Sequence, residues 1–337
     1  MNEENLVKNR SEIVFLYDIK DANPNGDPMD ENKPRIDEET GINIVTDVRL
    51  KRTIRDYLHN FKGKEIFVRE IEYEPGKIQD AKLRIEDFLK DAKGTKIKKT
   101  DLNLGQMKDI MGKNVKSDCV DVRLFGATIP VEKSAKEKSS ITLIGPVQFR
   151  FGRSLHRVDV VHIKGTGAFA SGKDMEQKTF REEYILPYSL ISFYGILNEN
   201  AAKTTGLTKE DVNLLLDGLW NGTKNLITRS KIGQVPRLLL NVVYKENNFH
   251  VGDLDKKLNL ETVDGKSERG IRDISEIKLN AVKLINALGG NKDKIERVEL
   301  KADDEVVFLL PEDKEGDKKE LVNSLREKGI QVQELSL

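Results

Sequence analysis

The sequence predicts an α+β fold in which an antiparallel sheet is backed by helices. The chain begins with a strand, a turn-rich loop and a basic helix within residues 12–61. It ends in a predicted β-β-α-β order over residues 298–335. Between these parts, residues 72–140 are rich in Lys, Asp and Glu, and helical periodicity replaces the apolar runs typical of strands. These observations fit a ferredoxin-like, or RRM-like, core that carries insertions.

The first strand and the loop after it differ sharply in composition. Residues 13–20 read Ile-Val-Phe-Leu-Tyr-Asp-Ile-Lys, which is typical of a strand buried on both faces. The next eight residues, Asp-Ala-Asn-Pro-Asn-Gly-Asp-Pro, are dense in turn formers. The loop over residues 21–45 is long for a strand-to-helix connection, so we expect it to be functional or partly disordered. Residues 66–70 predict a second strand.

A basic amphipathic helix is predicted over residues 46–61. Thr46 is a suitable N-cap, and Asp47 places an acid in the first turn. The buried stripe at helical spacing consists of Leu50, Ile54, Tyr57, Leu58 and Phe61. The remaining surface is crowded with the cations Arg49, Lys51, Arg52 and Arg55. They could form an ordinary solvated face, or they could bind phosphates beside the free N–H groups of the helix N-terminus.

The middle of the chain predicts a helical insertion followed by a return to strands. We expect one helix over residues 78–89, a second capped by Thr100-Asp101 and a third that starts at Ser117-Asp118. Residues 131–140 predict a charged, mobile linker. Strand character returns at residues 141–157.

A second strand-like run covers residues 181–197, where Pro187 predicts an edge position or a bulge. The segment 158–180, with a glycine-rich tip, lies between these two runs and predicts a protruding hairpin. Further elements are expected as a helix over 208–220, a strand over 237–244 and a helix over 277–288.

The bulk composition limits the class of protein. The 337 residues include 57 Lys and Arg against 57 Asp and Glu, which argues against nonspecific coating of nucleic acid but permits a local basic groove. A single cysteine, Cys119, cannot form an internal disulfide, which fits a reducing cytosol. No apolar run is long enough to span a bilayer, and the N-terminus does not resemble a signal peptide. We therefore expect a cytoplasmic protein without membrane partners.

Two windows contain basic residues and no acid. The first lies between Lys138 and Asp159 and includes Arg150, Arg153 and Arg157. The second covers residues 218–245, and its cations are Lys224, Arg229, Lys231, Arg237 and Lys245. Mixed charges are expected on a neutral surface, so these windows favour a polyanion partner. In Phe149-Arg150-Phe151, the aromatic rings could stack on bases while the arginine neutralises a phosphate. Alternatively, the phenylalanines could simply belong to the core.

The first loop also matches half of a calcium-binding motif. Asp21-x-Asn23-x-Asn25-Gly26 has the right spacing, but the twelfth position is Asn32 rather than Glu, and Pro24 lies inside the loop. We therefore expect no metal and no cofactor. The loop is either a structural turn or a surface whose amides meet a phosphate or a neighbouring subunit. The common nucleotide, hydrolase and metalloprotease motifs are absent from the sequence, and no catalytic residue is predicted.

The first loop and helix closely resemble the start of a known family. Two segments resemble the backbone subunit of type I CRISPR Cascade complexes. They are Asp-Ala-Asn-Pro-Asn-Gly-Asp-Pro at 21–28 and Thr-Asp-Val-Arg-Leu-Lys-Arg-Thr-Ile-Arg at 46–55. This subunit belongs to the RAMP superfamily, and the likeness is nearest to the type I-B version. Weaker matches follow at residues 121–126, 145–148 and 183–188, while the C-terminal third is similar only in outline.

The resemblance implies an RRM-like palm, a helical finger, a web loop and a protruding thumb. The expected parts are residues 1–71 (first part of the palm), 72–140 (finger and web linker), 141–157 (palm), 158–180 (thumb) and 181–337 (remainder of the palm and the C-terminal part).

The resemblance also implies a function and partners. Copies would assemble head to tail on one CRISPR RNA and present it for pairing with target DNA in antiviral defence. The other expected partners are the guide-end-capping, large and small subunits of Cascade. The role would be structural rather than enzymatic.

The residues implied to bind RNA lie in several segments. They are Asn23, Asn25, Thr46, Arg49, Lys51, Arg52, Arg55, Arg150, Arg153, Arg157, Lys164, Thr166 and Phe169, with Arg229 and Lys231 added from the second basic window. The cations would hold guide phosphates, while Lys164 and residues 166–169 would belong to the thumb. The hypothesis requires that these distant segments converge into one basic trough.

Two alternatives remain open at this point. A type III-like subunit would cut target RNA with a metal and an acid such as Asp21, Asp27 or Asp47. A scaffold made only of protein would bind no nucleic acid.

Overall fold

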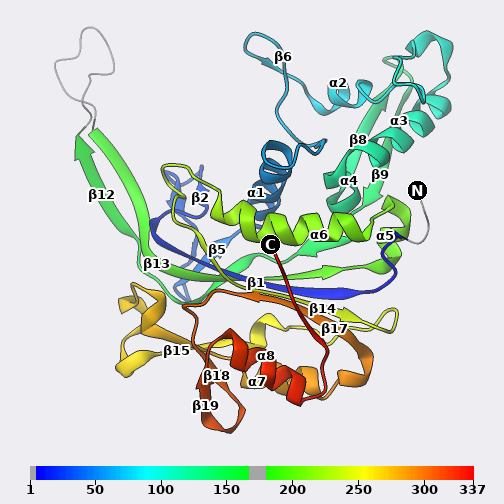
Figure 1. The fold of residues 1–337 in the computed structure, drawn as a ribbon. Helices are drawn as coiled ribbons and strands as arrows, with labels where there is room; N and C mark the ends of the chain where they lie inside the picture. Colours follow the sequence, from blue (N-terminus) through cyan, green and yellow to red (C-terminus); the bar gives the residue numbers. More distant parts are fainter. Residues whose placement is uncertain (1–4, 167–179) are drawn as a thin grey trace.

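The fold is mixed α/β and is dominated by one large antiparallel sheet. The computed structural model describes residues 5–166 and 180–337. Within them, the largest sheet has ten strands in the order β20-β17-β14-β1-β13-β11-β5-β4, and β10 and β12 also pair with β13 (Figure 1). At its centre lie β1 (Ser11–Ala22), β13 (Phe180–Leu197) and β14 (Val235–Tyr244). The coarse prediction of an α+β fold with an antiparallel sheet is confirmed.

The central strand β1 is buried on both faces, as its composition predicts. Ile13 and Phe15 point into a core beneath helices α1 and α6, while Val14 and Leu16 point into a second core on the opposite face. The remaining strands of the sheet are β4 (Ile36–Asp37), β5 (Ile42–Val45), β10 (Val147–Phe149), β11 (Gly152–Arg157), β12 (Val161–Thr166), β17 (Ile295–Ala302) and β20 (Val332–Glu334).

Helices α1 (Asp47–Asn60), α5 (Glu199–Thr205) and α6 (Lys209–Asp217) cover one face (Figure 1). Thr46 is the N-cap of α1, as predicted. After α6, a π-helical turn at Gly218–Gly222 packs directly against α1. A Cβ atom at Gly218 would lie 2.9 Å from Ile54 Cγ2, and one at Gly222 would lie 3.0 Å from Tyr57 Cβ. Only glycines allow the two segments to approach so closely.

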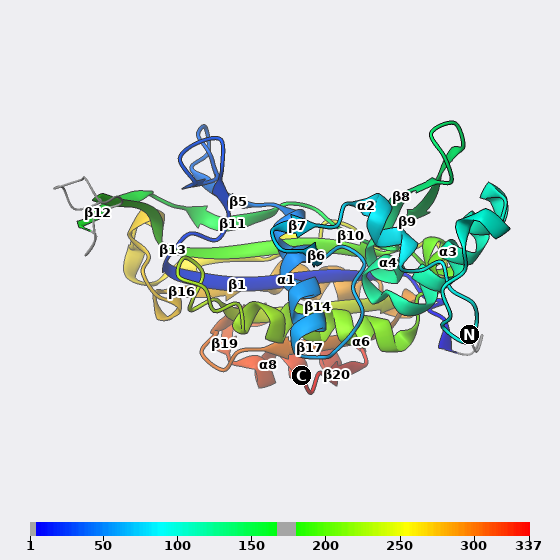
Figure 2. The same ribbon diagram turned by 90° about the horizontal axis from the view of Figure 1, so that it is seen from above.

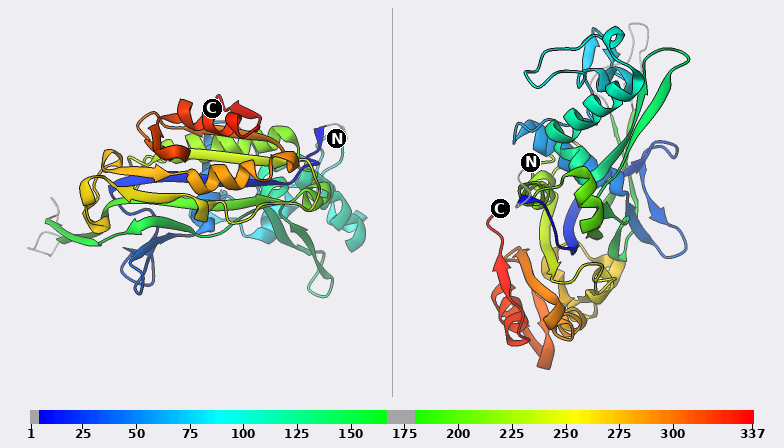
Figure 3. Two further views of the ribbon diagram at one scale, coloured as in Figure 1. Left: turned by 90° about the horizontal axis from the view of Figure 1, so that it is seen from below. Right: turned by 90° about the vertical axis from the view of Figure 1, so that its right-hand side faces the viewer.

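The C-terminal part covers the other face of the sheet (Figure 3). A second sheet contains β15 (Asn259–Thr262), β16 (Ile277–Asn280), β18 (Phe308–Leu310) and β19 (Lys314–Gly316). Helices α7 (Val282–Gly289) and α8 (Lys318–Glu327) accompany it. The predicted helix over 277–288 was too long, because Ile277 and Leu279 alternate with half-buried neighbours and form β16 instead.

The insertion after α1 has its own hydrophobic core, which includes Met107, Met111 and Cys119. Its elements are β6 (Glu72–Glu74), β7 (Lys77–Ile78), α2 (Ala81–Glu86), α3 (Leu104–Asp118), α4 (Val120–Phe125), β8 (Gly126–Glu132) and β9 (Lys138–Ile144).

Three predictions about the insertion were wrong. Residues 131–140 are not a linker, because β8 and β9 pair along their whole length with Ile129 opposite Ile141. Residues 66–70 form no strand, and only an isolated bridge from Glu65 to Cys119 occurs there. Helix α3 is capped by Asn103 rather than by Thr100-Asp101.

A two-stranded hairpin extends beyond the body of the molecule (Figure 1, left). It consists of β12 and the first part of β13, with Val161 opposite Ile185 and Thr166 opposite Phe180. No ladder pair joins Pro187 to Asp21, but the register is the same on both sides of them, so Pro187 lies within the central strand β13 without the predicted bulge or edge position. The small β2 (Gly26–Asp27) and β3 (Lys33–Pro34) pair in the first loop, which projects to the same side as the β8–β9 hairpin (Figure 2).

We expect Gly218→Val to lower the free energy of unfolding by about 1–3 kcal/mol, because the new side chain displaces α1 from the π-helical turn. Urea unfolding followed by circular dichroism measures this. Gly290→Ala is the matched control, since its nearest neighbour would be 3.4 Å from the new Cβ. Equal stability of the two variants would contradict the close packing.

Candidate nucleic-acid interface

The first loop is fastened to the N-terminus of α1 by two side chains. Asn25 Oδ1 accepts hydrogen bonds from the backbone N–H of Thr46 at 2.8 Å and from its hydroxyl at 2.9 Å. The Thr46 hydroxyl oxygen in turn accepts from the Arg49 N–H at 3.3 Å and caps the helix. The loop therefore holds a fixed position beside the first turn of α1.

A second connection joins this loop to the second basic window. The Asn23 N–H donates to the Ser230 carbonyl at 2.9 Å, which places Lys231 next to the loop. Asn23 Nδ2 donates to the Asn32 carbonyl at 2.7 Å, so the amide orientation is fixed. Its Oδ1 atom is then buried without a hydrogen-bond partner among the described residues.

Arg49 lies in this region without an acidic partner. Its guanidinium donates to the Thr53 hydroxyl at 3.0 Å, and its Nε is buried without a hydrogen-bond partner in the described part of the chain. Tyr17, Pro24 and Gln234 line the small hollow that surrounds it. Burial lowers the pKa of Arg49.

Lys231 is the second cation at this place. Its ammonium donates to the neighbouring Ser230 hydroxyl at 3.1 Å. Burial, and then the charge of Arg49, lower the pKa of Lys231. No carboxylate of the described residues lies within ion-pair distance of either cation, and Asp56, which is paired with Arg52, offsets the charge of Arg49 only at longer range. Partly buried charges without a counter-ion are costly, and an anion placed between them would remove the cost.

The other cations of α1 are already paired with acids. Lys51 donates to Asp47 at 2.9 Å, Arg52 to Asp56 at 2.8 Å and Arg55 to Asp121 at 2.9 Å. Lys51 and Arg55 both lie over the Phe125 ring, at 5.7 and 5.1 Å from its centroid. Lys51 also reaches Gln148 Oε1 at 3.4 Å. This second group borders the strands that follow the insertion.

The arginines of the first basic window lie farther along the sheet. Arg150 pairs with Asp253 and packs on the Tyr194 ring at 4.5 Å, on the face that carries the C-terminal part. Arg153 approaches Asp37 at 3.5 Å. The Arg157 side chain is exposed and makes no ion pair with any described residue.

Other residues predicted to bind RNA lie on strand β12 and at the base of the hairpin. Lys164 lies 3.4 Å from Glu182, and Arg229 pairs with Glu183. Thr166 is the last residue of β12, while Phe169 lies outside the described residues. A cavity of about 330 Å³ separates the hairpin base from the first loop, and Asn23, Tyr184 and Arg229 help to line it.

The structure thus brings together Asn23, Asn25, Thr46, Arg49 and Lys231. Lys51 and Arg55 form a neighbouring group around Phe125, and Arg150 lies on the opposite face of the sheet. The sequence indicated only Asp47 and Asp56 as acids that offset these cations, and the structure adds Asp121 and Asp253. Asp47 and Asp56 were readable, because each is four residues from its partner. Asp121 and Asp253 are paired only through the fold.

Acids near this interface have protein partners. Asp27 accepts from Arg35 at 2.6 Å and from the Met29 N–H at 3.0 Å, and Asp47 pairs with Lys51. Across residues 5–166 and 180–337, no group of three or more His, Cys, Asp or Glu is arranged to hold a metal ion.

In the same residues, no helix has the length and apolar character needed to cross a membrane.

Comparison with known proteins decides the family. Residues 9–281 match the family model of CRISPR-associated protein Cas7. The chain belongs to the Cas7 family. A CRISPR-associated protein Cas7 from Haloferax volcanii is 34% identical over 317 residues, which cover 88% of this chain and 87% of that relative. The family indicated by the motifs of the first loop and helix is therefore confirmed.

Two solved structures from RNA-guided complexes are similar to this chain over most of its length. One chain is described as "CRISPR RNA-guided surveillance complex, pre-nicking", with a TM-score of 0.48, 13% identity and coverage of 84% of this chain and 89% of that one. Another, "CRISPR RNA-guided surveillance complex", has the same TM-score and identity and covers 87% of this chain and 88% of its own.

We expect Arg49→Gln to raise the pKa of Lys231 toward its usual value, because the change removes the like charge that disfavours the ammonium. NMR titration of isotopically methylated lysines measures it. Arg52→Gln is the control, since Arg52 is neutralised by Asp56 and should leave Lys231 unchanged. An unaltered Lys231 pKa in Arg49→Gln would contradict the proximity of the two cations.

Proposed function

We propose that this Cas7 protein is the guide-binding backbone subunit of a type I CRISPR surveillance complex, of the type I-B kind. Copies assemble head to tail along the CRISPR RNA and present it for pairing with target DNA. Two observations support the proposal. The chain belongs to the Cas7 family, and Arg49 and Lys231 form a partly buried cation pair without an acid beside the first loop.

In the proposed mechanism, one guide phosphate binds between Arg49 and Lys231. Charge-assisted hydrogen bonds from both side chains compensate their repulsion, and the positive end of the α1 dipole favours the anion further. The fixed Asn25–Thr46 contact holds the helix N-terminus beside the loop. Contacts of this kind hold the RNA backbone whatever its sequence, so the base edges stay free to pair with DNA.

We further propose that the chain divides into the parts known for this kind of subunit. The palm comprises residues 1–71, 141–157 and 181–337, with an RRM-like arrangement of β1, β13 and β14 under α1. The finger and web comprise residues 72–140. The thumb comprises residues 158–180, and the β12–β13 hairpin that projects from the body would reach the next copy. The remaining partners are the guide-end-capping, large and small subunits, in the cytoplasm.

Cations that already have an acidic partner contribute less to the affinity for guide RNA than cations without one. Lys51, Arg55, Arg150 and Arg229 must each exchange a protein carboxylate for a phosphate, and the gain from one bond offsets the loss of the other. Arg49 and Lys231 lose no ion pair when a phosphate binds. We therefore assign the largest share of guide affinity to these two residues.

We expect Arg49→Gln combined with Lys231→Gln to weaken binding of single-stranded guide RNA and to flatten its salt dependence. Both side chains bind the same phosphate, so its loss reduces the slope of log K against log salt by about 0.7 for each subunit. Filter binding at several salt concentrations measures both quantities. Lys283→Gln with Lys319→Gln removes the same charge from α7 and α8 on the other face and should leave the slope unchanged.

Equal slopes for the two double variants would overturn the assignment of Arg49 and Lys231. The double variant Lys51→Ala and Arg55→Ala should lower affinity less, because Asp47 and Asp121 neutralise these cations in the free chain.

Two measurements separate the proposal from the other functional classes. We expect RNA of uniform length to copurify with the protein, seen as a high 260/280 absorbance ratio, whereas a scaffold made only of protein would show none. Incubating the assembled complex with complementary RNA and Mg²⁺ should leave that RNA intact. Cleavage that Asp21→Asn, Asp27→Asn or Asp47→Asn abolishes would instead establish a type III-like activity.

A further inference from the structure

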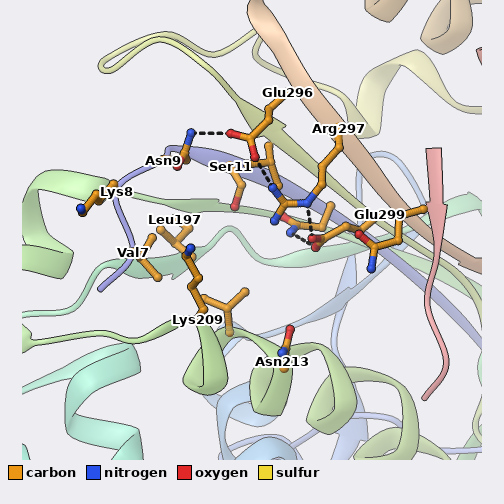
Figure 4. Close-up of a pocket in the computed structure, with 14 residues that line it drawn as sticks. Val7, Lys8, Asn9, Ser11, Leu197, Lys209, Asn213, Glu296, Arg297 and Glu299 are labelled. Atoms are coloured by element: carbon orange, nitrogen blue, oxygen red, sulfur yellow. Dashed lines mark hydrogen bonds and ion pairs between the residues drawn. The ribbon is translucent and has the colours of Figure 1, made fainter. Parts of the chain in front are cut away.

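A second cavity lies far from the proposed guide site. Its volume is about 390 Å³, and it is enclosed by the N-terminal segment, helix α6 and strands β1, β14 and β17 (Figure 4). Ser11 lines it at the start of β1, whereas Tyr17 lines the hollow around Arg49. Six residues of extended strand separate the two sites by about 20 Å. The cavity is therefore independent of the proposed function.

The sheet face inside this cavity is unusually polar for a buried surface. On the face covered by α6, the apolar Leu239 of β14 is followed two residues later by Asn241, with Glu299 paired beside it on β17. Asn241 is 1% exposed, Ser11 3% and Glu299 7%. A sheet face under a helix normally consists of apolar side chains, so these three positions call for polar partners.

The internal hydrogen bonds leave part of this polar group unsatisfied. Asn241 Nδ2 donates to Glu299 Oε2 at 2.7 Å, which fixes the orientation of the amide. Its Oδ1 is consequently buried and has no hydrogen-bond partner among the described residues. The Ser11 hydroxyl, in the same cavity, likewise has no protein partner among them. An acceptor and a hydroxyl thus remain to receive a ligand N–H group.

The charges of the cavity favour an anionic ligand. Arg297 Nε donates to Glu299 at 2.7 Å and its Nη1 pairs with Glu296, so both carboxylates are neutralised in part, while Nη2 has no partner in the described part of the chain. Lys209 rises from α6 toward the strands and makes no ion pair with a described residue (Figure 4). Lys8 lies at the rim with its ammonium turned outward. Lys209 and Arg297 Nη2 therefore remain inside the cavity to bind an anion.

From these features we propose that the cavity binds the carboxyl-terminal residue of a partner protein chain. Its carboxylate binds Lys209 and Arg297 Nη2, and its peptide N–H donates to the unpaired oxygens of the floor, a recurrent mode of terminal-carboxylate capture. An apolar side chain packs among the aliphatic residues of the lining, Val7, Leu197, Val212 and Val243. A nucleotide fits less well, because the lining contains no aromatic ring on which a base could stack.

N-acetyl-L-leucine carries this chemistry in its smallest form and is the probe. We expect it to shift the NMR signals of Ser11, Val212 and Asn241 in a saturable way. N-acetyl-L-leucinamide, which lacks the carboxylate, should bind at least about fivefold more weakly, as should Lys209→Ala with the acid. Lys203→Ala, an exposed lysine on α5, is the matched control and should bind the acid normally.

Three outcomes would overturn the proposal: no saturable shift with the acid, equal binding of acid and amide, or preferential binding of cytidine 5′-monophosphate. Guide RNA binding is measured in parallel. Lys209→Ala should leave it unchanged, and Arg49→Gln with Lys231→Gln should leave binding of the acid unchanged. Failure at one site is thereby distinguished from failure at the other.

Discussion

The burial of β1 on both faces is the constraint on which the rest of the structure depends. A strand between two cores has no solvent for its polar side chains, so its acids must be satisfied by the layers around it. Glu12 accepts from the N–H groups of Val251 and Gly252 at 2.9 Å, and Asp18 accepts from Arg237 Nε at 2.9 Å. Burial raises the pKa of Asp18, so its ion pair with Arg237 offsets only part of the desolvation. These bonds tie the C-terminal part to the sheet.

The position of the proposed guide site follows from where β1 ends. The strand delivers the first loop to the N-terminus of α1, and the Asn23–Ser230 contact brings Lys231 to the same place. Arg49 and Lys231 are then partly buried at one place without an acid within ion-pair distance. Most of the other cations considered are neutralised locally, which agrees with the neutral composition of the whole chain. In the proposal, a subunit holds few open phosphate sites until it assembles on RNA, and a long guide would be bound by many weak sites acting together.

The sequence predicted local features well and long-range features poorly. β1, α1 and the cap Thr46 were predicted because burial pattern, helical spacing and capping chemistry are local properties. The β8–β9 hairpin was missed because its charged turn, with Lys133 and Glu137, hides strands whose buried residues are few. The sequence predicted Arg55 as a cation on the helix surface. Its partner Asp121 lies 66 positions away and is brought to it only by tertiary packing. The polar cavity beneath α6 could not be predicted, since its residues come from six separate segments.

The central claim is that Arg49 and Lys231 hold one guide phosphate between them. A structure of the protein assembled on its CRISPR RNA, determined by electron cryomicroscopy, tests it most directly. The account predicts a phosphate within hydrogen-bonding distance of the Arg49 guanidinium and the Lys231 ammonium in each internal copy. An RNA path that leaves this pair facing solvent or protein, with the guide held elsewhere on the chain, would contradict it.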